Sequence, residues 1–321
     1  MMINDVEKLR ERISAVAGRS IPGRLQIVED TSDFMSIDYG NVLRLNGNDY
    51  LVMGNAREGR FGIDEQPKFW VKSCIDLSTG LRKIIKLVFK ESFESRIGSS
   101  VYQCVRSAKK ESDVLKAMQD NPHFMHGKSV LDAAGNLVRV IDFVRGQTFY
   151  EYMRRFDMSH ETYYQQIFPN VIQRVIDCIQ AIADLHDAGL HHGDIRADHI
   201  LLDNPEEPFV WIDFDYDIDS LEYDVICLGN VLLQAVGKGR HTLYDIRLNA
   251  EMYPDYNDPV ISDDMSLMFP HRVANLRKVF PHIAGDLNDI LMRFSSEGRD
   301  RYRHARILVS DLRSLFPRGS A

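Results

Sequence analysis

The spacing of apolar residues changes near Gly146, and this change limits the possible folds more than any other feature of the sequence. Before Gly146, short apolar runs are separated by turn signals such as Asn46-Gly47-Asn48, which favours antiparallel strands. After Gly146, apolar residues recur at helical spacing over residues 171–186, and residues 223–236 are apolar on nearly every side, which predicts a helix buried within its lobe. The sequence therefore predicts a strand-rich front part and a helix-rich back part.

Individual elements follow from the same patterns. Two helices are predicted in the front part, at residues 4–16 and 102–118. Six strands are predicted there, at residues 41–45, 49–53, 68–75, 83–89, 128–132 and 137–143. In the back part, two short apolar runs at 200–202 and 209–212 lie between the long helices, and residues 237–268 are predicted to be irregular.

Length and composition narrow the class of protein. A chain of 321 residues is longer than one hydrophobic core usually serves, so we expect two lobes. The net charge of −8 argues against a nucleic-acid partner, because such proteins normally carry a basic excess. Four scattered cysteines indicate reduced thiols rather than a disulfide framework. Without a signal-like start or an apolar run of about 18 residues, the sequence predicts a cytoplasmic protein that does not insert into a membrane.

The residues that indicate chemistry lie between the two long helices. His192-Gly193-Asp194 follows the first helix, and the second short strand ends in Asp213-Phe214-Asp215. Asp194 and Asp213 should therefore occupy neighbouring loops, where carboxylates about 6 Å apart repel by roughly 3 kcal/mol at an effective dielectric constant of about 20. Arg196 or a hard divalent ion would relieve that repulsion, and Mg²⁺ usually shares such oxygen ligands with phosphates.

These motifs resemble those of the protein-kinase-like superfamily. His192-Gly193-Asp194 is similar to its catalytic loop, and Asp213-Phe214-Asp215 is similar to its metal-binding Asp-Phe-Gly. The resemblance implies that Asp194 positions the attacking hydroxyl, that Arg196 meets the γ-phosphate and that Asp213 binds Mg²⁺. His199 takes the place of a metal-binding Asn, and Asp215 is either a further metal ligand or a loop residue.

The resemblance extends to the front part. It implies that Lys86 holds the ATP phosphates and that Glu111 pairs with Lys86, although a solvated face would also explain each charge. The remaining implied nucleotide contacts are a phosphate loop at Gly59 and Gly62 (otherwise an ordinary hairpin turn), the hinge backbone at Asp142 and Val144, and Leu201. Asp224 is expected to brace the catalytic loop, and His192 to pack beside Phe214.

Several positions depart from the usual pattern. Ile84 replaces a small residue beside adenine, and Arg57 stands where the first glycine of the phosphate loop is expected. His199 offers nitrogen to the metal, as in lipopolysaccharide kinases, and predicts a preference for Mn²⁺ over Mg²⁺. Only 11 positions separate Asp213 from Asp224, and Gly193 replaces the Arg that senses a phosphorylated loop, so control by loop phosphorylation is not expected.

The prediction is a two-lobed α+β fold of the protein-kinase-like type, with an antiparallel-sheet N-lobe that carries one main helix and a mostly helical C-lobe. The predicted parts are an extension at 1–40, the N-lobe at 41–141, a hinge at 142–146 and the C-lobe at 147–321. The predicted activity is transfer of the γ-phosphate of ATP, with Mg²⁺ or Mn²⁺, to a protein Ser or Thr. A small-molecule kinase of the aminoglycoside or sugar type and a nucleotide-binding pseudokinase remain open.

Overall fold

The computed structural model describes residues 3–18, 25–60, 63–204, 206–253, 256, 259–298 and 300–318. The contacts divide the chain into two compact units. The sheet unit comprises residues 1–91, 107–119 and 125–143, and the helical unit comprises residues 92–106, 120–124 and 144–321. Both units are interrupted in sequence, so segments far apart in the chain share a core.

The sheet unit is built on seven strands in the order β1-β2-β3-β4-β5-β9-β8. Every neighbouring pair is antiparallel except β1 and β2, which run parallel. The strands are β1 (Ile27–Val28), β2 (Val42–Leu45), β3 (Asn48–Arg60), β4 (Ile63–Asp76), β5 (Arg82–Lys86), β8 (Gly127–Leu131) and β9 (Leu137–Asp142). All six predicted front strands are confirmed, and the largest differences are that β3 and β4 extend further and that β5 ends earlier.

Alternation along the strands gives the sheet two apolar faces. Leu43 and Val52 point into a core that also receives Ile85, Val138 and Val140. Their neighbours Val42 and Leu51 point to the other face, where Leu9 and Ile13 of helix α1 (Ile3–Ala17) cover them. The predicted N-terminal helix is thus confirmed, and its apolar stripe packs on the sheet.

The second helix of this unit is α2 (Ala108–Ala117), which begins at the N-cap Ser107, whose side chain accepts from Lys110 N. The predicted helix at 102–118 is therefore wrong over its first residues. Residues 100–106 alternate between exposed and less exposed positions as strand β7 (Ser100–Arg106), with Cys104 and Arg106 buried. Their two-residue period overrides the apolar spacing that suggested a helix.

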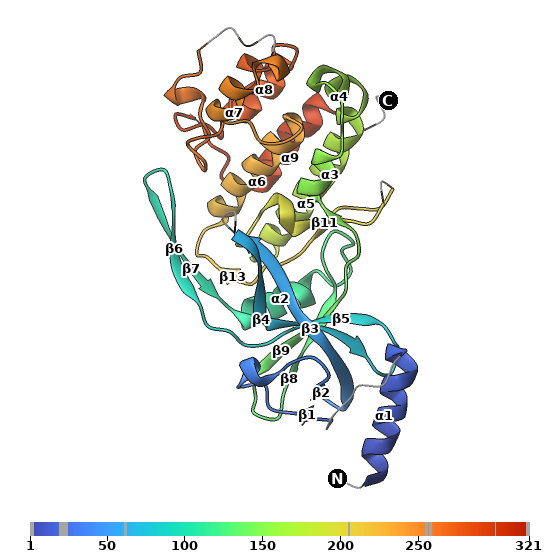
Figure 1. Cartoon of the computed structure of the whole chain (residues 1–321). Coiled ribbons are helices and arrows are strands. Elements are labelled where there is room, and N and C mark those ends of the chain that lie inside the picture. The colour runs from blue at the N-terminus through green and yellow to red at the C-terminus, as the bar shows by residue number, and fades with distance from the viewer. Residues whose placement is uncertain are drawn as a thin grey trace. The chain divides into compact units, whose positions relative to one another are not determined.

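The helical unit contains seven α-helices among its described residues (Figure 1). They are α3 (Phe149–Arg154), α4 (His160–Gln166), α5 (Phe168–Asp187), α6 (Leu221–Val236), α7 (Leu243–Leu248), α8 (Gly285–Met292) and α9 (Ala305–Leu315). The two long predicted helices correspond to α5 and α6, and α6 is buried along almost its whole length. Helix α7, which begins with a capping box between Thr242 and Asp245, lies within the stretch that was predicted to be irregular.

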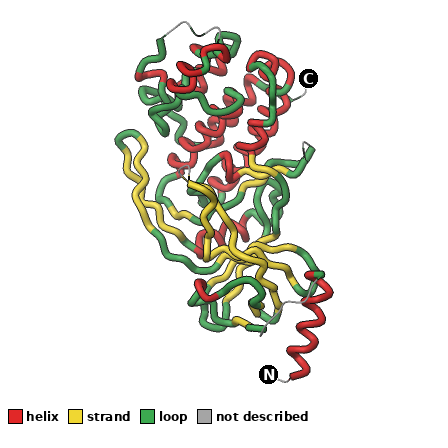
Figure 2. Tube along the Cα trace, viewed as in Figure 1, coloured by secondary structure: helices red, strands yellow, loops and turns green. Residues whose placement is uncertain are grey.

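Two small antiparallel sheets complete the helical unit (Figure 2). One contains β10 (Gln147–Thr148), β11 (Ile200–Leu202) and β12 (Val210–Trp211), and it confirms the two short runs predicted between the helices. The other contains β13 (Tyr216–Asp217), β7 and β6 (Ser92–Ile97). The β6–β7 hairpin lies between β5 and α2 in sequence, yet it belongs to the helical unit. Among the described residues, no helix has the length and apolar character needed to cross a membrane.

A buried histidine links α4 to the end of α6. His160 lies flat on Phe280 with 3.6 Å between ring centroids, and its ring nitrogens lie 2.9 Å from Val236 O and 2.8 Å from His282 Nε2. Burial lowers the pKa of His160 to about 3, the hydrogen bond to Val236 opposes that shift, and the nearby His241, His282 and Lys238 add to it. His160 is therefore neutral in the folded protein at pH values where it is protonated in the unfolded chain.

Stability should accordingly fall as the pH drops below about 6.5, because only the unfolded chain then binds the proton. In His160→Phe, the free energy of unfolding should lose this part of its pH dependence, which approaches about 1.4 kcal/mol per pH unit. Urea unfolding of both proteins between pH 7.5 and 5 measures the difference. Parallel stability curves would contradict the assignment.

Candidate functional site

In the sheet unit, one charged side chain of α2 and two charged side chains of the sheet form a buried cluster. Lys86 on β5 and Arg139 on β9 are directly opposite each other in the sheet, and their neighbours Ile85 and Val140 point to the other face. Two like charges in such a pair repel. Glu111 of α2 relieves this repulsion, because its Oε1 lies 2.6 Å from Lys86 Nζ and its Oε2 lies 3.0 Å from Arg139 Nε.

All three side chains of this cluster are at most 3% exposed, so a solvated face does not explain them. The predicted pairing of Lys86 with Glu111 is present, while Arg139 is a partner that the sequence analysis missed. Its only signal was a charged residue within the apolar run Leu137-Val138-Arg139-Val140. Glu111 thus contacts two cations at once, which fixes the position of the Lys86 ammonium group.

The other predicted nucleotide contacts are scattered through the chain. Gly59 lies in β3, and Gly62 lies outside the described residues. Asp142 ends β9 and forms an ion pair with Lys83, and Val144 follows the point where the chain passes into the helical unit. Leu201 is half-buried in β11. Their nucleotide contacts stay predictions.

In the helical unit, a carboxylate of α6 holds the loop that precedes β11. Asp224 is fully buried and accepts from the backbone N–H groups of His192 at 2.6 Å and Gly193 at 2.8 Å, while His186 Nε2 lies 3.1 Å away. Burial alone would raise the pKa of Asp224, but the hydrogen bond from His186, the charge of His192 and the Gly193 N–H lower it to about 2. Asp224 therefore braces the loop as a carboxylate, as the sequence analysis expected.

His192 supports the same loop from below. Its ring packs edge-on against Trp211 and Phe214, with centroids 5.1 Å and 5.7 Å apart, and its Nδ1 accepts from Asp194 N at 3.2 Å. The side chain is fully buried among these groups, which confirms the predicted structural role beside Phe214.

His199 brings the two predicted carboxylates together. Its Nδ1 lies 2.8 Å from the backbone oxygen of Asp194 and 3.6 Å from Asp194 Oδ2, and its Nε2 lies 3.7 Å from Asp213 Oδ2. Donation from Nδ1 to the Asp194 carbonyl would leave the lone pair of Nε2 on the side of Asp213. The neighbouring loops thus place Asp194, His199 and Asp213 in one cluster, as predicted.

Asp213 adopts a left-handed backbone conformation with φ of 60°. For a residue other than glycine this conformation is uncommon and strained, and such strain gathers at functional sites. The backbone is fixed just before it, because Ile212 N donates to His199 O at 3.0 Å. The Asp213 carboxylate is therefore held beside His199 at an energetic cost.

The electrostatics of Asp194 reflect this crowding. Burial raises the pKa of Asp194 above its usual 3.8, the charges of His199 and Arg196 lower it, and those of Asp213 and Asp215 raise it further. A carboxylate with a raised pKa is a stronger base than an ordinary surface aspartate.

The cluster fits a metal ion only as a shared site. Within the part of the chain that the structure describes, no group of three or more His, Cys, Asp or Glu side chains converges as a metal site. Asp213 and His199 supply two donors, so the remaining positions would fall to water or to a ligand. Mg²⁺ and Mn²⁺ are commonly bound in this way, by one or two protein groups together with substrate phosphates.

Arg196 and Asp215, the two other predicted residues of this unit, have partners within the chain. Arg196 forms an ion pair with Asp198 and is about a quarter exposed. Asp215 is 4% exposed and forms an ion pair with Arg106 of β7, a residue that the sequence analysis missed because it assigned this segment to a helix. A metal at Asp215 would have to share this carboxylate with a guanidinium.

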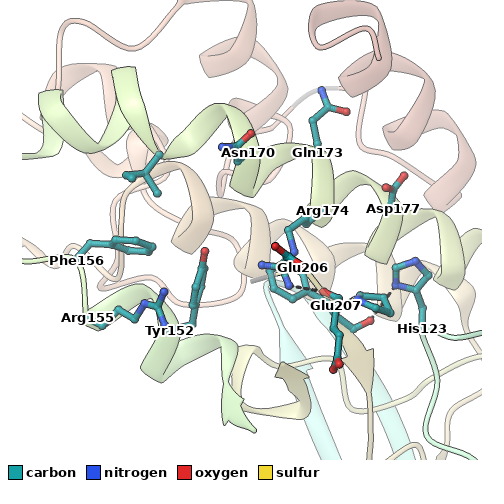
Figure 3. Close-up of a pocket in the computed structure, with 13 residues that line it drawn as sticks. His123, Tyr152, Arg155, Phe156, Asn170, Gln173, Arg174, Asp177, Glu206 and Glu207 are labelled. Carbon is teal, nitrogen blue, oxygen red and sulfur yellow. Dashed lines mark hydrogen bonds between the residues drawn. The ribbon is translucent and has the colours of Figure 1, made fainter. Parts of the chain in front are cut away.

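A separate hollow of about 660 Å³ lies elsewhere on the helical unit (Figure 3). Its walls come from α3, α5 and the loop after β11, and none of Asp194, His199 or Asp213 lines it. Two guanidinium groups of the hollow stack on aromatic rings that line it: Arg174 lies 4.0 Å from the Phe209 ring centroid, and Arg155 lies 4.7 Å from that of Tyr152. The hollow is therefore distinct from the cluster around His199.

Comparisons with known proteins match the part of the chain that contains this cluster. The model of the lipopolysaccharide kinase (Kdo/WaaP) family matches residues 152–217, which include Asp194, His199 and Asp213. A protein of Plasmodium falciparum named "Probable serine/threonine-protein kinase 2" is 25% identical over 137 residues, or 38% of this chain. The match spans about a quarter (26%) of that relative's own length.

Among solved structures, a mutant of the PknI kinase domain of Mycobacterium tuberculosis aligns with a TM-score of 0.49 and 14% identity, over 83% of this chain and 94% of that one. The match to the family model and the match to the Plasmodium relative, together with the motifs His192-Gly193-Asp194 and Asp213-Phe214-Asp215, place the chain in the protein-kinase-like superfamily.

The close approach at Gly193 can be tested by substitution. Gly193 has φ of 83°, and a Cβ there would lie 2.0 Å from Tyr216 O, whereas Gly189 has φ of 74° with nothing within 4 Å. Gly189→Ala should cost only the left-handed strain of about 1–2 kcal/mol. Gly193→Ala should cost a further 1–3 kcal/mol or more from overpacking, measured by urea unfolding. Equal losses would show that the backbone of Tyr216 does not pack against Gly193.

Proposed function

We propose that the protein is a kinase that transfers the γ-phosphate of ATP to a hydroxyl group. The observation that carries the proposal is the cluster in the helical unit, in which His199 brings Asp194 and Asp213 together. Phosphoryl transfer needs a group that orients the nucleophile and a site that neutralises phosphate charge. Asp194 and the pair Asp213–His199 would supply these two functions.

In the sheet unit, Lys86 would hold the α- and β-phosphates of ATP. Glu111 fixes its ammonium group from one side, and Arg139 fixes Glu111 in turn. Because Glu111 contacts both Lys86 and Arg139, the Lys86 ammonium group is held in a defined position, where it would meet the phosphates.

Asp213 and His199 would hold the divalent ion that accompanies ATP, and this ion would neutralise phosphate charge. A nitrogen donor is less usual for Mg²⁺ than for Mn²⁺, so both ions belong in every assay. Asp194 would accept a hydrogen bond from the acceptor hydroxyl and take its proton, which its raised pKa favours.

For the acceptor, we propose a Ser or Thr hydroxyl of a protein. The similarity to a relative named as a serine/threonine-protein kinase supports this choice. The closing segment at 301–312, which resembles the last helix of Ser/Thr kinases, supports it as well, and α9 begins within this segment at Ala305.

A small-molecule hydroxyl is the second candidate. Only 11 positions separate Asp213 from Asp224, which leaves little chain for a peptide platform, and the match over residues 152–217 is to lipopolysaccharide kinases. Both acceptors would use the same phosphate-binding residues.

One assay tests the function and separates the acceptors. The protein is incubated with labelled ATP and Mg²⁺ or Mn²⁺, alone, with generic protein substrates and with a metabolite panel. We expect label on protein, and Asp194→Asn should lower transfer by about 10²–10⁴-fold because the proton acceptor is lost. Lys86→Met should weaken ATP binding, while Lys109→Met, which removes an exposed charge from α2, should not.

Label only on a metabolite would favour the small-molecule kinase. Stabilisation by ATP without transfer to any acceptor would favour a pseudokinase and contradict the proposed activity.

The pH dependence of transfer provides an independent test of Asp194. Because burial raises its pKa above the usual 3.8, the proton acceptor becomes protonated while the pH is still above that value. As the pH is lowered, kcat/KM should therefore fall, with its midpoint at a pH above 3.8. A midpoint at or below 3.8 would exclude Asp194 as the group that limits the rate on the acid side.

A further inference from the structure

The β6–β7 hairpin attaches a remote part of the chain to the segment that follows Asp213. Strand β7 pairs with β13, so that Arg106 lies opposite Tyr216 and Val105 lies opposite Asp217. Strand β13 contains only two residues, and its backbone pairing alone gives a weak attachment. Side chains must therefore supply much of the connection.

Arg106, the last residue of β7, is the centre of that connection. Its guanidinium forms an ion pair with Asp215, donates to the hydroxyl group of Tyr216, and lies 4.4 Å from the centroid of the Tyr216 ring. The side chains of Arg106 and Asp215 are both 4% exposed. A buried pair of this kind is strongly held, because loss of either partner leaves an uncompensated charge.

The segment after Asp213 is also contacted by the loop that precedes β11, at Gly193. Tyr216 O occupies the space that a side chain at position 193 would need. A side chain at position 193 therefore has no room. From the same loop, His191 Nε2 accepts from Ile218 N at 2.9 Å.

Asp213 lies two residues before Asp215 and is strained, so both of its flanks have to be held. The preceding flank is held by the hydrogen bond from Ile212 N to His199 O. The following flank is held at Asp215 and Tyr216 by Arg106.

We propose that Arg106 is a positioning residue that fixes Asp213 beside His199. The metal-binding part of this inference rests on the proposed function. Asp215 then serves as the partner of Arg106, whereas the sequence left it open as a further metal ligand or a loop residue.

Four variants test the proposal. Arg106→Met removes the charge, and Arg106→Met/Asp215→Asn replaces the ion pair with neutral groups, so that no charge is left buried alone. Arg106→Lys keeps the charge without the planar fork. Arg96→Met is the matched control, because it removes a 72% exposed arginine from β6 of the same hairpin.

The readouts are thermal unfolding, amide hydrogen exchange over residues 212–217, and the Mn²⁺ concentration at which an ATP complex forms half-maximally. We expect the double variant to regain most of the thermal stability lost in Arg106→Met. Exchange over residues 212–217 should stay at least tenfold faster, and the required Mn²⁺ concentration should stay about tenfold higher. Arg106→Lys should fall between wild type and Arg106→Met, and Arg96→Met should match wild type in all three readouts.

Recovery of exchange and of the Mn²⁺ requirement along with stability in the double variant would overturn the proposal, because Arg106 would then have a structural role only. If wild-type protein bound neither Mn²⁺ nor ATP, the proposed function would fail by itself. Hydrogen exchange would still decide the role of Arg106: unchanged exchange in Arg106→Met would overturn it, and faster exchange in the double variant would support it.

Discussion

The arrangement around His199 depends on one buried carboxylate. Asp224 has no contact with solvent, and it stays ionised because it accepts from two consecutive backbone N–H groups and lies within hydrogen-bond distance of His186. These bonds tie the loop to α6, the most deeply buried helix of its unit. This attachment also fixes the positions of Asp194 and His199, since both lie a few residues further along the same loop.

The same principle recurs at two other places in the chain. Glu111 lies between Lys86 and Arg139, and Asp215 lies against Arg106. In each case a buried carboxylate holds a cationic side chain in one position. An ion pair on the surface would leave the same side chain mobile. Buried charges are costly unless they are paired, so each pair defines its geometry closely. A site for a charged ligand benefits from this rigidity, because little reorganisation is needed when the ligand arrives.

Much of the fold could be predicted from the sequence. The alternating strands and the striped helix α5 were correct, because local periodicity reports which face of an element is buried. Helix α6 was correct because a helix that is apolar on nearly every side has to be buried. The motifs around Asp194, Asp213 and Asp224 were also informative, because short spacings on adjoining loops and helices limit where such side chains can go. The resemblance was needed to connect Lys86 with Glu111, which are 25 positions apart.

The residues that were missed depend on partners distant in sequence. Arg139 acquires its role only from the strand register that places it opposite Lys86. Arg106 meets Asp215 across 109 positions, and nothing local indicated that contact. The apolar spacing of its segment suggested a helix, whereas residues 100–106 form a strand that pairs with β6 and β13. Gly193 likewise shows its steric reason only once Tyr216 is in place.

The interrupted membership of the two units affects how the chain can be divided. The chain passes from one unit to the other after residues 91, 106, 119, 124 and 143. No single cut therefore yields two pieces that each contain a whole unit, and an expressed fragment starting at residue 144 would lack the strand that pairs with β13. During synthesis, the hairpin emerges more than a hundred residues before its partner strand, so this unit must close a long loop before its small sheet can form. Because the chain crosses between the units five times, each unit is completed only by segments that follow parts of the other.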